Sequence, residues 1–357
     1  MKPDLRQQVH ALPNVLTEPL PAVNTPYSRP AVRRPIGQRI HLLPVTGITD
    51  ELSEQQTAIA LRSVYAAETL ELEIPVTDQL LREGEIDLLV GSGSDPGIRR
   101  RNKPNEDSIL EIHATYFDRG MPLPVGLFVI ADGMGGHASG QEASQLAIQV
   151  LSDVVLSSVR DHIGDEEVLE QLLADGAYHA NLAVHERNLQ EKKFMGTTLT
   201  AALVVGTTAY IVNVGDSRTY LYRHCDGLTQ ITRDHSVVAR LVEENMIHLD
   251  EIYTHPRRNE IYRCLGERES VEVDTFAVPL QTGDSLLLCS DGLWEMVRDP
   301  HIRDILQSTS STPSQASTQL IEAALKGGGH DNISVIVVHV TQTSPKLTQP
   351  VVAAYAH

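Results

Sequence analysis

Short apolar runs that end beside an acidic residue recur along this chain and indicate how it folds. The first run, Val125–Ala131, is followed by Asp132, and three glycines come soon after it: Gly133, Gly135 and Gly136. A short apolar run bounded by turn residues is typical of a buried β-strand, and glycines permit backbone conformations that other residues avoid. An aspartate held on such a turn, beside backbone carbonyls, is a suitable ligand for a hard cation.

Three further stretches share this arrangement of strand and acid: Ala209–Val214 before Asp216, Ser285–Cys289 before Asp291, and Asp331 directly before the strand-like Ile333–Val338. Because strand ends of packed sheets meet at one rim, we expect the four aspartates to converge there. Carboxylates that crowd together without compensation are forced to take up protons. Divalent cations supply that compensation, so the pattern predicts a metal site.

The remaining periodicity predicts the layers around these strands. Apolar residues recur at helical spacing over Ala143–Val154 and Leu169–Val184, and further helices are expected at Val237–Asn245, Pro300–Gln307 and Pro313–Lys326. Additional strands are expected at Ile86–Gly91, Ser108–His113, Leu199–Val205, Arg218–Tyr222, Leu228–Ile231 and Ser270–Val278. Strands in runs, with helices grouped between them, favour an α+β fold in which two sheets pack together under outer helices.

Composition narrows the classes of function. The formal net charge of −18 argues against nucleic acid or an anionic membrane as the main partner. Apolar residues make up 41% of the 357 residues, which is ample for a core. The three cysteines (Cys225, Cys264 and Cys289) follow no metal-ligand spacing, which favours thiols in a reducing compartment. No bilayer-spanning run or signal-like segment is found, so a cytoplasmic protein is expected.

The domain plan follows from the same patterns. Residues 1–85 begin with a stretch dense in proline and are expected to form a largely disordered extension. Residues 86–341 form the expected folded domain, and 342–357 a C-terminal tail.

Eight motifs then identify a resemblance. In order they are N-E-D-S at Asn105–Ser108, A-D-G-M-G-G-H at Ala131–His137, M-G-T-T at Met195–Thr198, V-G-D-S-R at Val214–Arg218, T-R-D-H-S at Thr232–Ser236, C-L-G at Cys264–Gly266, C-S-D-G-L at Cys289–Leu293 and D-N-I-S-V at Asp331–Val335. Their order resembles that of the metal-dependent Ser/Thr protein phosphatases of type 2C, the PPM family, in its bacterial form. The resemblance implies a four-layer αββα sandwich with two central antiparallel β-sheets, and a flap at about residues 237–262.

The resemblance also implies a binuclear Mg²⁺ or Mn²⁺ centre at one edge of the sandwich. Asp132 would bridge two ions, the Gly133 carbonyl would bind one of them, and Asp291 and Asp331 would complete the other site. Asp216 together with Asp291 matches a weaker third site. Asp132 and Asp291 are accordingly the expected catalytic carboxylates.

Three neighbouring polar residues would act in support of this centre. Glu106 and Asp107 would act mainly through water bound to the ions, and Asn332 lies beside the ligand Asp331. His137 and His235 are expected to be structural rather than ligands.

The phosphate-binding arginine departs from the spacing of the family. The family has it five residues before the Asp of N-E-D, which here is Asn102. A one-residue insertion would make it Arg101, our first choice, with Arg100 second. A solvated basic loop is the alternative.

The implied function is hydrolysis of phosphoserine and phosphothreonine by an activated water, opposing a Ser/Thr kinase in signalling. The expected partners are phosphorylated proteins, or a kinase, and the expected state is a monomer. Two other hypotheses remain: a metal-dependent hydrolase of small phosphate esters, and a catalytically dead binding module. The complete set of four aspartates argues against the second, because dead copies usually lose metal ligands.

Overall fold

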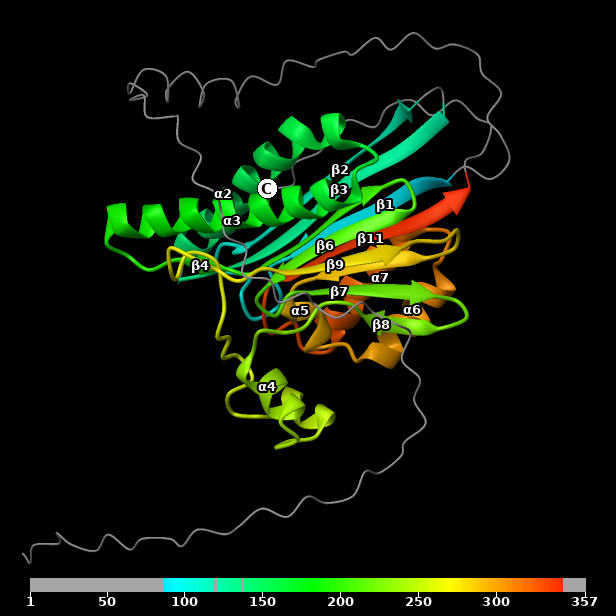
Figure 1. Cartoon of the computed structure of the whole chain (residues 1–357). Helices are drawn as coiled ribbons and strands as arrows, with labels where there is room; N and C mark the ends of the chain where they lie inside the picture. The colour runs from blue at the N-terminus through cyan, green and yellow to red at the C-terminus, as the bar shows by residue number, and fades with distance from the viewer. Residues whose placement is uncertain (1–85, 119–120, 136–137, 343–357) are drawn as a thin grey trace, which may run out of the picture. The chain divides into compact units, whose positions relative to one another are not determined.

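The computed structural model describes residues 86–118, 121–135 and 138–342. The predicted extension at 1–85, the tail from residue 343 and His137 lie outside the described residues. The described part is built from two antiparallel β-sheets with helices on their outer faces (Figure 1). The α+β fold with two central antiparallel sheets, predicted from the sequence, is thus confirmed.

The first sheet has five strands, in the spatial order β1 (Ile86–Asp95), β11 (Ile333–Gln342), β10 (Ser285–Cys289), β7 (Arg218–Arg223) and β8 (Gly227–Gln230). Strand β11 lies inside the sheet, between β1 and β10, and is almost entirely buried, in agreement with its many Val and Ile residues. It pairs on one side with β1, with Ile86 opposite Gln342. The first and last described strands of the chain are therefore neighbours.

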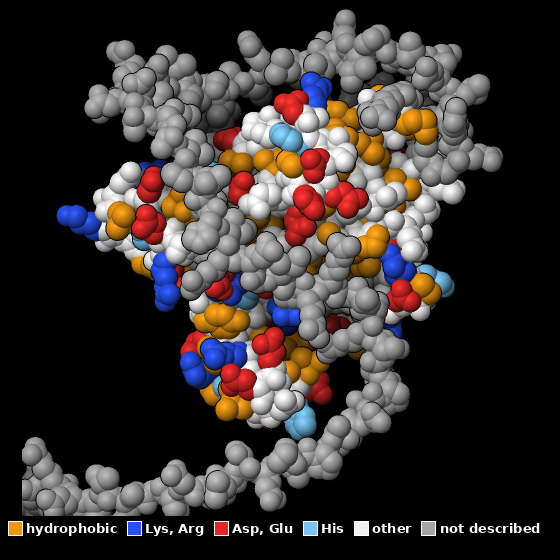
Figure 2. All heavy atoms as spheres, in the orientation of Figure 1, with side chains coloured by type: hydrophobic (Ala, Val, Ile, Leu, Met, Phe, Trp, Pro, Cys, Tyr) orange, Lys and Arg blue, Asp and Glu red, His pale blue; other side chains and the backbone are white. Residues whose placement is uncertain are grey.

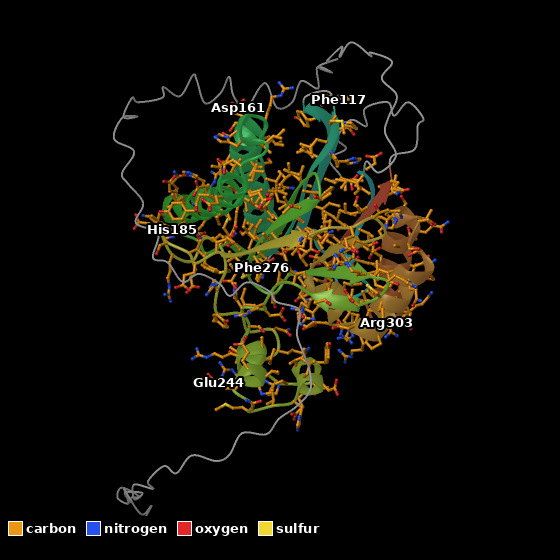
Figure 3. All side chains as sticks on the ribbon, turned by 45° about the vertical axis from the view of Figure 1, so that its right-hand side comes forward. Phe117, Asp161, His185, Glu244, Phe276 and Arg303 are labelled. Atoms are coloured by element: carbon orange, nitrogen blue, oxygen red, sulfur yellow. The ribbon has the colours of Figure 1, made fainter. Side chains whose placement is uncertain are left out.

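The second sheet contains β2 (Asp107–Asp118), β3 (Met121–Met134), β5 (Leu199–Val205), β6 (Thr208–Val214) and β9 (Asp274–Pro279), and the short β4 (Gly196–Thr197) pairs with β3. Strands β2 and β3 form a long hairpin whose register places Asp107 directly opposite Asp132. Phe117, which pairs with Pro122 near the other end of this hairpin, is exposed (Figure 3). The hairpin thus brings two acidic side chains to the same end of the sheet.

Helices cover both outer faces. The second sheet is covered by α2 (Ala138–Ser158), η1 (Val159–His162) and α3 (Glu166–Glu191), and the first sheet by α5 (Asp291–Trp294), α6 (Asp299–Ser308) and α7 (Pro313–Lys326). Each helical layer shares a buried aliphatic cluster with its sheet. A third cluster, which includes Phe128, Leu288 and Ile336, lies between the two sheets. Burial of apolar surface in these three layers supplies the main driving force for the sandwich.

The flap (residues 237–262) contains α4 (Val237–Glu243) and η2 (Leu249–Tyr253), and it forms a separate lobe beside the sheets (Figures 1 and 3, where Glu244 marks it). Hydrophobic, acidic and basic side chains are mixed on the surface of this lobe (Figure 2). Ser236 begins α4 by accepting a hydrogen bond from the Ala239 N–H at 3.3 Å, as an N-cap residue does.

Among the residues that the structure describes, none of the helices combines the length and apolar character needed to span a bilayer.

Candidate active site

The two sheets each contribute acidic residues to one rim. Asp132 lies near the end of β3, and Asp216 follows β6, so both belong to the second sheet. Asp291 follows β10 and opens α5, and Asp331 immediately precedes the turn into β11. The rim therefore forms only where the two sheets are packed together.

Charge interactions confirm that the structure brings these four aspartates together. The pKa of Asp132 is raised well above its ordinary value, first by burial and then by the charges of Asp107, Asp291, Asp331 and Asp216. Burial, followed by the charges of Asp216 and Asp331, also raises the pKa of Asp291 well above normal. The side chains of Asp132 and Asp291 are half-buried, so they remain in contact with solvent. The rim is thus a confined, strongly acidic site.

Asp107 and Glu106 lie at the start of β2, beneath this cluster. Burial raises the pKa of Asp107 to about 6, although hydrogen bonds from Ser334 and Ser290 oppose the rise. The Ser290 hydroxyl donates to Asp107 Oδ2 at 2.8 Å. The Glu106 N–H donates to Asn332 Oδ1 at 2.9 Å, and the Asn332 amide donates to the Pro96 carbonyl at 3.0 Å. Asn332 therefore fixes the turn that carries Asp331 against the base of β2.

Gly133 lies in the tightest part of the rim. Its N–H donates to the Glu106 carbonyl at 3.1 Å. A Cβ atom at this position would lie 2.0 Å from the Gly140 carbonyl oxygen, so no other residue fits without movement of the backbone. The sequence pattern of an acid followed by glycine is thus required by close packing of β3 on α2.

Buried oxygen atoms without partners show what the rim can bind. Glu106 Oε1, Asp107 Oδ1 and Asp291 Oδ1 are buried and have no hydrogen-bond partner. Buried, unpaired carboxylate oxygens are costly, and they are the hard ligands that suit Mg²⁺ and Mn²⁺. Within the described ranges, no three His, Cys, Asp or Glu side chains are arranged as a ready-made ion cage. The fit to a hard cation rests on the chemistry and burial of these oxygens.

The structure places Arg100, and not Arg101, at the rim. The Arg100 guanidinium donates hydrogen bonds to Glu106 and to Asp331, whereas Arg101 is exposed. The Lys103 N–H donates to the Arg100 carbonyl at 2.8 Å and closes a turn here. The preference for Arg101 assumed one extra residue between the arginine and N-E-D, whereas Arg100 requires two. The geometry therefore favours Arg100.

Two residues at the rim were missed by the sequence analysis. Burial raises the pKa of Glu295, and its charge contributes to the raised pKa values of both Asp291 and Asp216. Its position four residues after Asp291 was a usable signal, because such residues share a helix face. Trp294 donates from Nε1 to the Asp216 carbonyl at 3.0 Å.

His235 has the structural role that its sequence context predicted. The Gly215 N–H donates to His235 Nδ1 at 3.0 Å, and the His235 N–H donates to the Gly215 carbonyl at 2.9 Å. These bonds hold the turn that carries Asp216.

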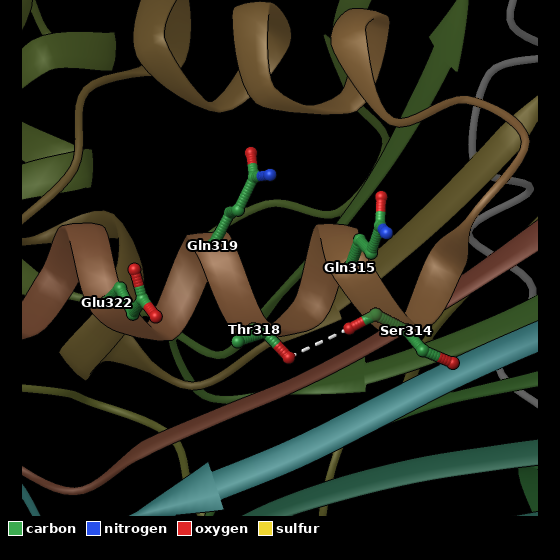
Figure 4. Close-up of a pocket in the computed structure, with 5 residues that line it drawn as sticks. All are labelled: Ser314, Gln315, Thr318, Gln319 and Glu322. Carbon is green, nitrogen blue, oxygen red and sulfur yellow. Dashed lines mark hydrogen bonds between the residues drawn. The ribbon is translucent and has the colours of Figure 1, made fainter.

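A pocket of about 610 Å³ lies elsewhere, on the outer face of α7 (Figure 4). It is lined by five exposed polar residues: Ser314, Gln315, Thr318, Gln319 and Glu322. The Thr318 hydroxyl bonds only within its own helix, donating to the Ser314 carbonyl at 2.9 Å. An open, solvated depression of this kind gathers no reactive groups, so the acidic rim remains the candidate site.

Comparison with known proteins agrees with this geometry. The family model described as protein phosphatase 2C matches residues 96–326. Serine/threonine phosphatase Stp of Listeria welshimeri is 40% identical over 214 residues, covering 59% of this chain and 83% of that protein. Serine/threonine protein phosphatase PstP of Mycobacterium tuberculosis is 40% identical over 266 residues, covering 73% of this chain and 46% of that protein.

A solved structure has the same fold. The crystal structure of the catalytic domain of PstP in complex with 2 manganese ions is 36% identical, with a TM-score of 0.58 over 72% of this chain and 99% of that chain. The motifs, the two-sheet architecture, the acidic rim and these similarities agree, and the chain belongs to the protein phosphatase 2C family as a serine/threonine protein phosphatase.

Proposed function

We propose that the acidic rim holds two Mg²⁺ or Mn²⁺ ions and uses them to hydrolyse phosphoserine and phosphothreonine in proteins. Asp132, the Gly133 carbonyl, Asp291 and Asp331 would hold these two ions. Asp216 and Asp291 would hold a weaker third ion. The observation that carries this proposal is the group of buried carboxylates with raised pKa values and unpaired oxygens. The manganese-bound PstP structure supports it.

Metal ions explain why so many acids are buried in one place. When bound, a pair of such ions lowers the pKa of a water molecule and supplies a nucleophile near neutral pH. Glu106 and Asp107 would orient this water with their free oxygens. Asn332 would keep Glu106 and Asp331 in register through the hydrogen bond that it accepts from the Glu106 N–H.

Arg100 is the residue that we assign to the phosphate group. Its guanidinium is at the rim and contacts two acids there. A phosphate monoester presents oxygens in a geometry that matches the two-pronged guanidinium, and the bonds are charge-assisted. Arg100 would orient the phosphorus for in-line attack and stabilise the charge that develops on its oxygens.

The substrate class follows from the family, and the biological role is proposed with it. The relatives carry the name serine/threonine phosphatase, so phosphorylated proteins are the expected substrates. Such an enzyme would reverse the action of a Ser/Thr kinase.

The test is release of phosphate from a phosphothreonine peptide by the full chain. The reaction is run with Mn²⁺, with Mg²⁺ and with a chelator, and a nucleotide monophosphate serves as the competing small substrate. We expect metal-dependent release from the peptide that the chelator stops, and slower turnover of the nucleotide. Equal or faster turnover of the nucleotide would indicate a small-ester hydrolase, and no release from folded protein would indicate a binding module.

A further inference from the structure

The backbone ladder beside β3 is interrupted at Asp132. Thr198 lies opposite Asp132, between β4 and β5, and belongs to neither strand. The pairs on either side of the interruption are Ile130 with Thr200 and Gly133 with Thr197. An antiparallel pair at this position would exchange two backbone hydrogen bonds. One of them is formed, from the Thr198 N–H to the Asp132 carbonyl at 2.9 Å.

Threonine hydroxyls take the place of the second ladder bond. The Asp132 N–H donates to Thr198 Oγ1 at 3.0 Å instead of to the Thr198 carbonyl. The Thr197 hydroxyl lies 2.9 Å from both the Asp132 and the Thr198 carbonyl oxygens and donates to this pair. Thr197 is fully buried and Thr198 is 2% exposed. The backbone of Asp132 is therefore held by two side chains of the M-G-T-T motif.

Thr198 also contacts the turn that carries Asp216. Its Oγ1 lies 2.7 Å from Oγ of Ser217, which is fully buried and directly follows Asp216. A Cβ atom at Gly215, the residue before Asp216, would lie 2.7 Å from the Thr198 methyl carbon. The methyl group thus packs on the turn while the hydroxyl joins it to Asp132. Threonine supplies both groups, whereas serine lacks the methyl and valine lacks the hydroxyl.

A second link of the same kind lies two residues further along β5. Thr200 Oγ1 is 2.8 Å from Thr219 Oγ1, and both residues are fully buried. Like the link from Thr198 to Ser217, it joins residues 19 positions apart. Neither Thr200 nor Thr219 adjoins an aspartate of the rim in the sequence. The two links therefore match in chemistry and burial and differ in what they hold.

We propose that Thr198 is a positioning residue whose hydroxyl fixes Asp132 for metal binding, so that the affinity of the rim for Mn²⁺ and the turnover of substrate depend on it. This inference rests on the metal role of Asp132 proposed above. Without the hydroxyl, the Asp132 N–H loses its acceptor, and the turn has to move to find another. A small displacement of a group that acts on the reacting atoms is enough to slow a reaction strongly.

The test uses Thr198→Val in the full chain, which removes the hydroxyl and nearly keeps the volume. We expect the dissociation constant for Mn²⁺, measured by isothermal titration calorimetry, to rise about tenfold or more, as for other residues that orient metal ligands. At saturating Mn²⁺, kcat for a phosphothreonine peptide should fall about 10²-fold. KM should change less than about threefold, because Arg100 is untouched.

Two variants serve as matched controls. Thr198→Ser keeps the hydroxyl and should restore kcat and the Mn²⁺ affinity to within about threefold of the unaltered protein. Thr200→Val removes the hydroxyl of the second link and should change both quantities less than about twofold. In a chelator the two valine variants should lose similar amounts of Tm. Added Mn²⁺ should then raise Tm less in Thr198→Val than in Thr200→Val, because binding to the folded state is weaker.

Asp132→Asn distinguishes failure of the metal assignment from failure of this inference. Unchanged Mn²⁺ binding in Asp132→Asn would remove the metal role of Asp132 and the role of Thr198 together. If Asp132→Asn binds Mn²⁺ more weakly, but Thr198→Val has the kcat and Mn²⁺ affinity of Thr200→Val, the positioning role alone is overturned.

Ser217→Ala provides the test if Thr198→Val does not fold. This variant removes the partner of the Thr198 hydroxyl on the neighbouring turn and leaves Thr198 itself in place. It should weaken Mn²⁺ binding about threefold, since the hydroxyl is then less firmly oriented. Mn²⁺ binding equal to that of the unaltered protein would overturn the inference.

Discussion

Two groups of buried acids in this molecule have opposite surroundings. Asp234 receives three hydrogen bonds from Arg218, and Asp284 receives two from Arg223, at 2.9 and 2.7 Å. At the rim, Asp132 and Asp291 instead face other carboxylates. Asp234 and Asp284 thus each have an arginine partner, whereas the Arg100 guanidinium at the rim contacts Glu106 and Asp331 and leaves Asp132 and Asp291 among carboxylates.

The difference has an energetic meaning. A buried ion pair with complete hydrogen bonds has offset the cost of desolvation, and it adds specificity to the packing. Uncompensated acids make the fold less stable until a cation or a proton neutralises them. The stability of the rim therefore depends on what neutralises its carboxylates.

The largest effect is expected from Asp291→Asn, which removes a charge but hardly changes volume. We expect kcat to fall by about 10⁴-fold, the scale on which a member of a catalytic unit acts. The metal-free variant should be at least as stable as the unaltered protein, because an uncompensated acid is gone. Phosphate release and urea unfolding measure the two effects, and full activity would show that the ligand assignment is wrong.

The opposite behaviour is expected at Arg218. Arg218→Ala leaves Asp234 buried without its partner and should lower the free energy of unfolding by about 3–5 kcal/mol. Arg240→Ala, which breaks an exposed pair with Glu244, is the matched control and should cost less than about 1 kcal/mol. Urea unfolding measures both free energies of unfolding. Equal losses in the two variants would mean that the buried ion pair contributes no more to stability than the exposed one.

Arg100 and Arg101 test which guanidinium belongs to the rim. Arg100→Ala should raise KM for a phosphopeptide about tenfold or more, because a charge-assisted hydrogen bond to phosphate is lost. Arg101→Ala should leave KM nearly unchanged, since its side chain is exposed. Steady-state kinetics at saturating Mn²⁺ decide this, and the reverse result would restore the choice made from the sequence.

The smallest effect is a pH dependence of the metal-free protein. Burial raises the pKa of Asp107 to about 6, and burial together with the charge of Asp234 raises that of Asp216 to about 7, from ordinary values of 3.8. Because these pKa values are raised, the folded state binds more protons than the unfolded state between pH 4 and pH 7. The free energy of unfolding therefore falls as pH rises through this range. We expect Tm in a chelator to drop over this range by at least about 2–4 °C, the change that corresponds to about 1 kcal/mol in a domain of this size.

The control for this prediction is the same scan with Mn²⁺. Bound cations compensate the ionised acids, so the fall in Tm should be smaller. If Tm in the chelator instead rises between pH 4 and pH 7, the carboxylates of the rim are not uncompensated.

The sequence predicted those parts of the fold that local rules determine. The helix expected at Pro313–Lys326 has these bounds in the structure, because proline favours the first turn and Gly327 ends it. The helix expected at Pro300–Gln307 extends one residue further at each end. Strand β3 is longer than its apolar run because pairing with β2 continues to Met121, where the hairpin is no longer buried.

The parts that could not be predicted depend on tertiary contacts. The direction of Arg100 is set by one turn, and the sequence alone does not decide whether one or two extra residues lie between the arginine and N-E-D. The bond from Trp294 to Asp216 spans 78 positions of sequence, and no local pattern marks it. Convergence of the four aspartates was predictable because each adjoins a strand, and the spacing of four between Asp291 and Glu295 becomes informative once a helix is placed at Asp291.

The pairing of β1 with β11 also determines when the five-stranded sheet can form during synthesis of the chain. Ser94 lies opposite Ser334, 240 positions later in the chain, and their hydroxyls are 2.9 Å apart. A strand that emerges early from the ribosome must therefore wait for nearly the last strand before its sheet can close, and long-range pairing of this kind is slow. Because Asp291 and Asp331 flank β10 and β11, a nascent chain has no assembled rim until translation of the domain is finished.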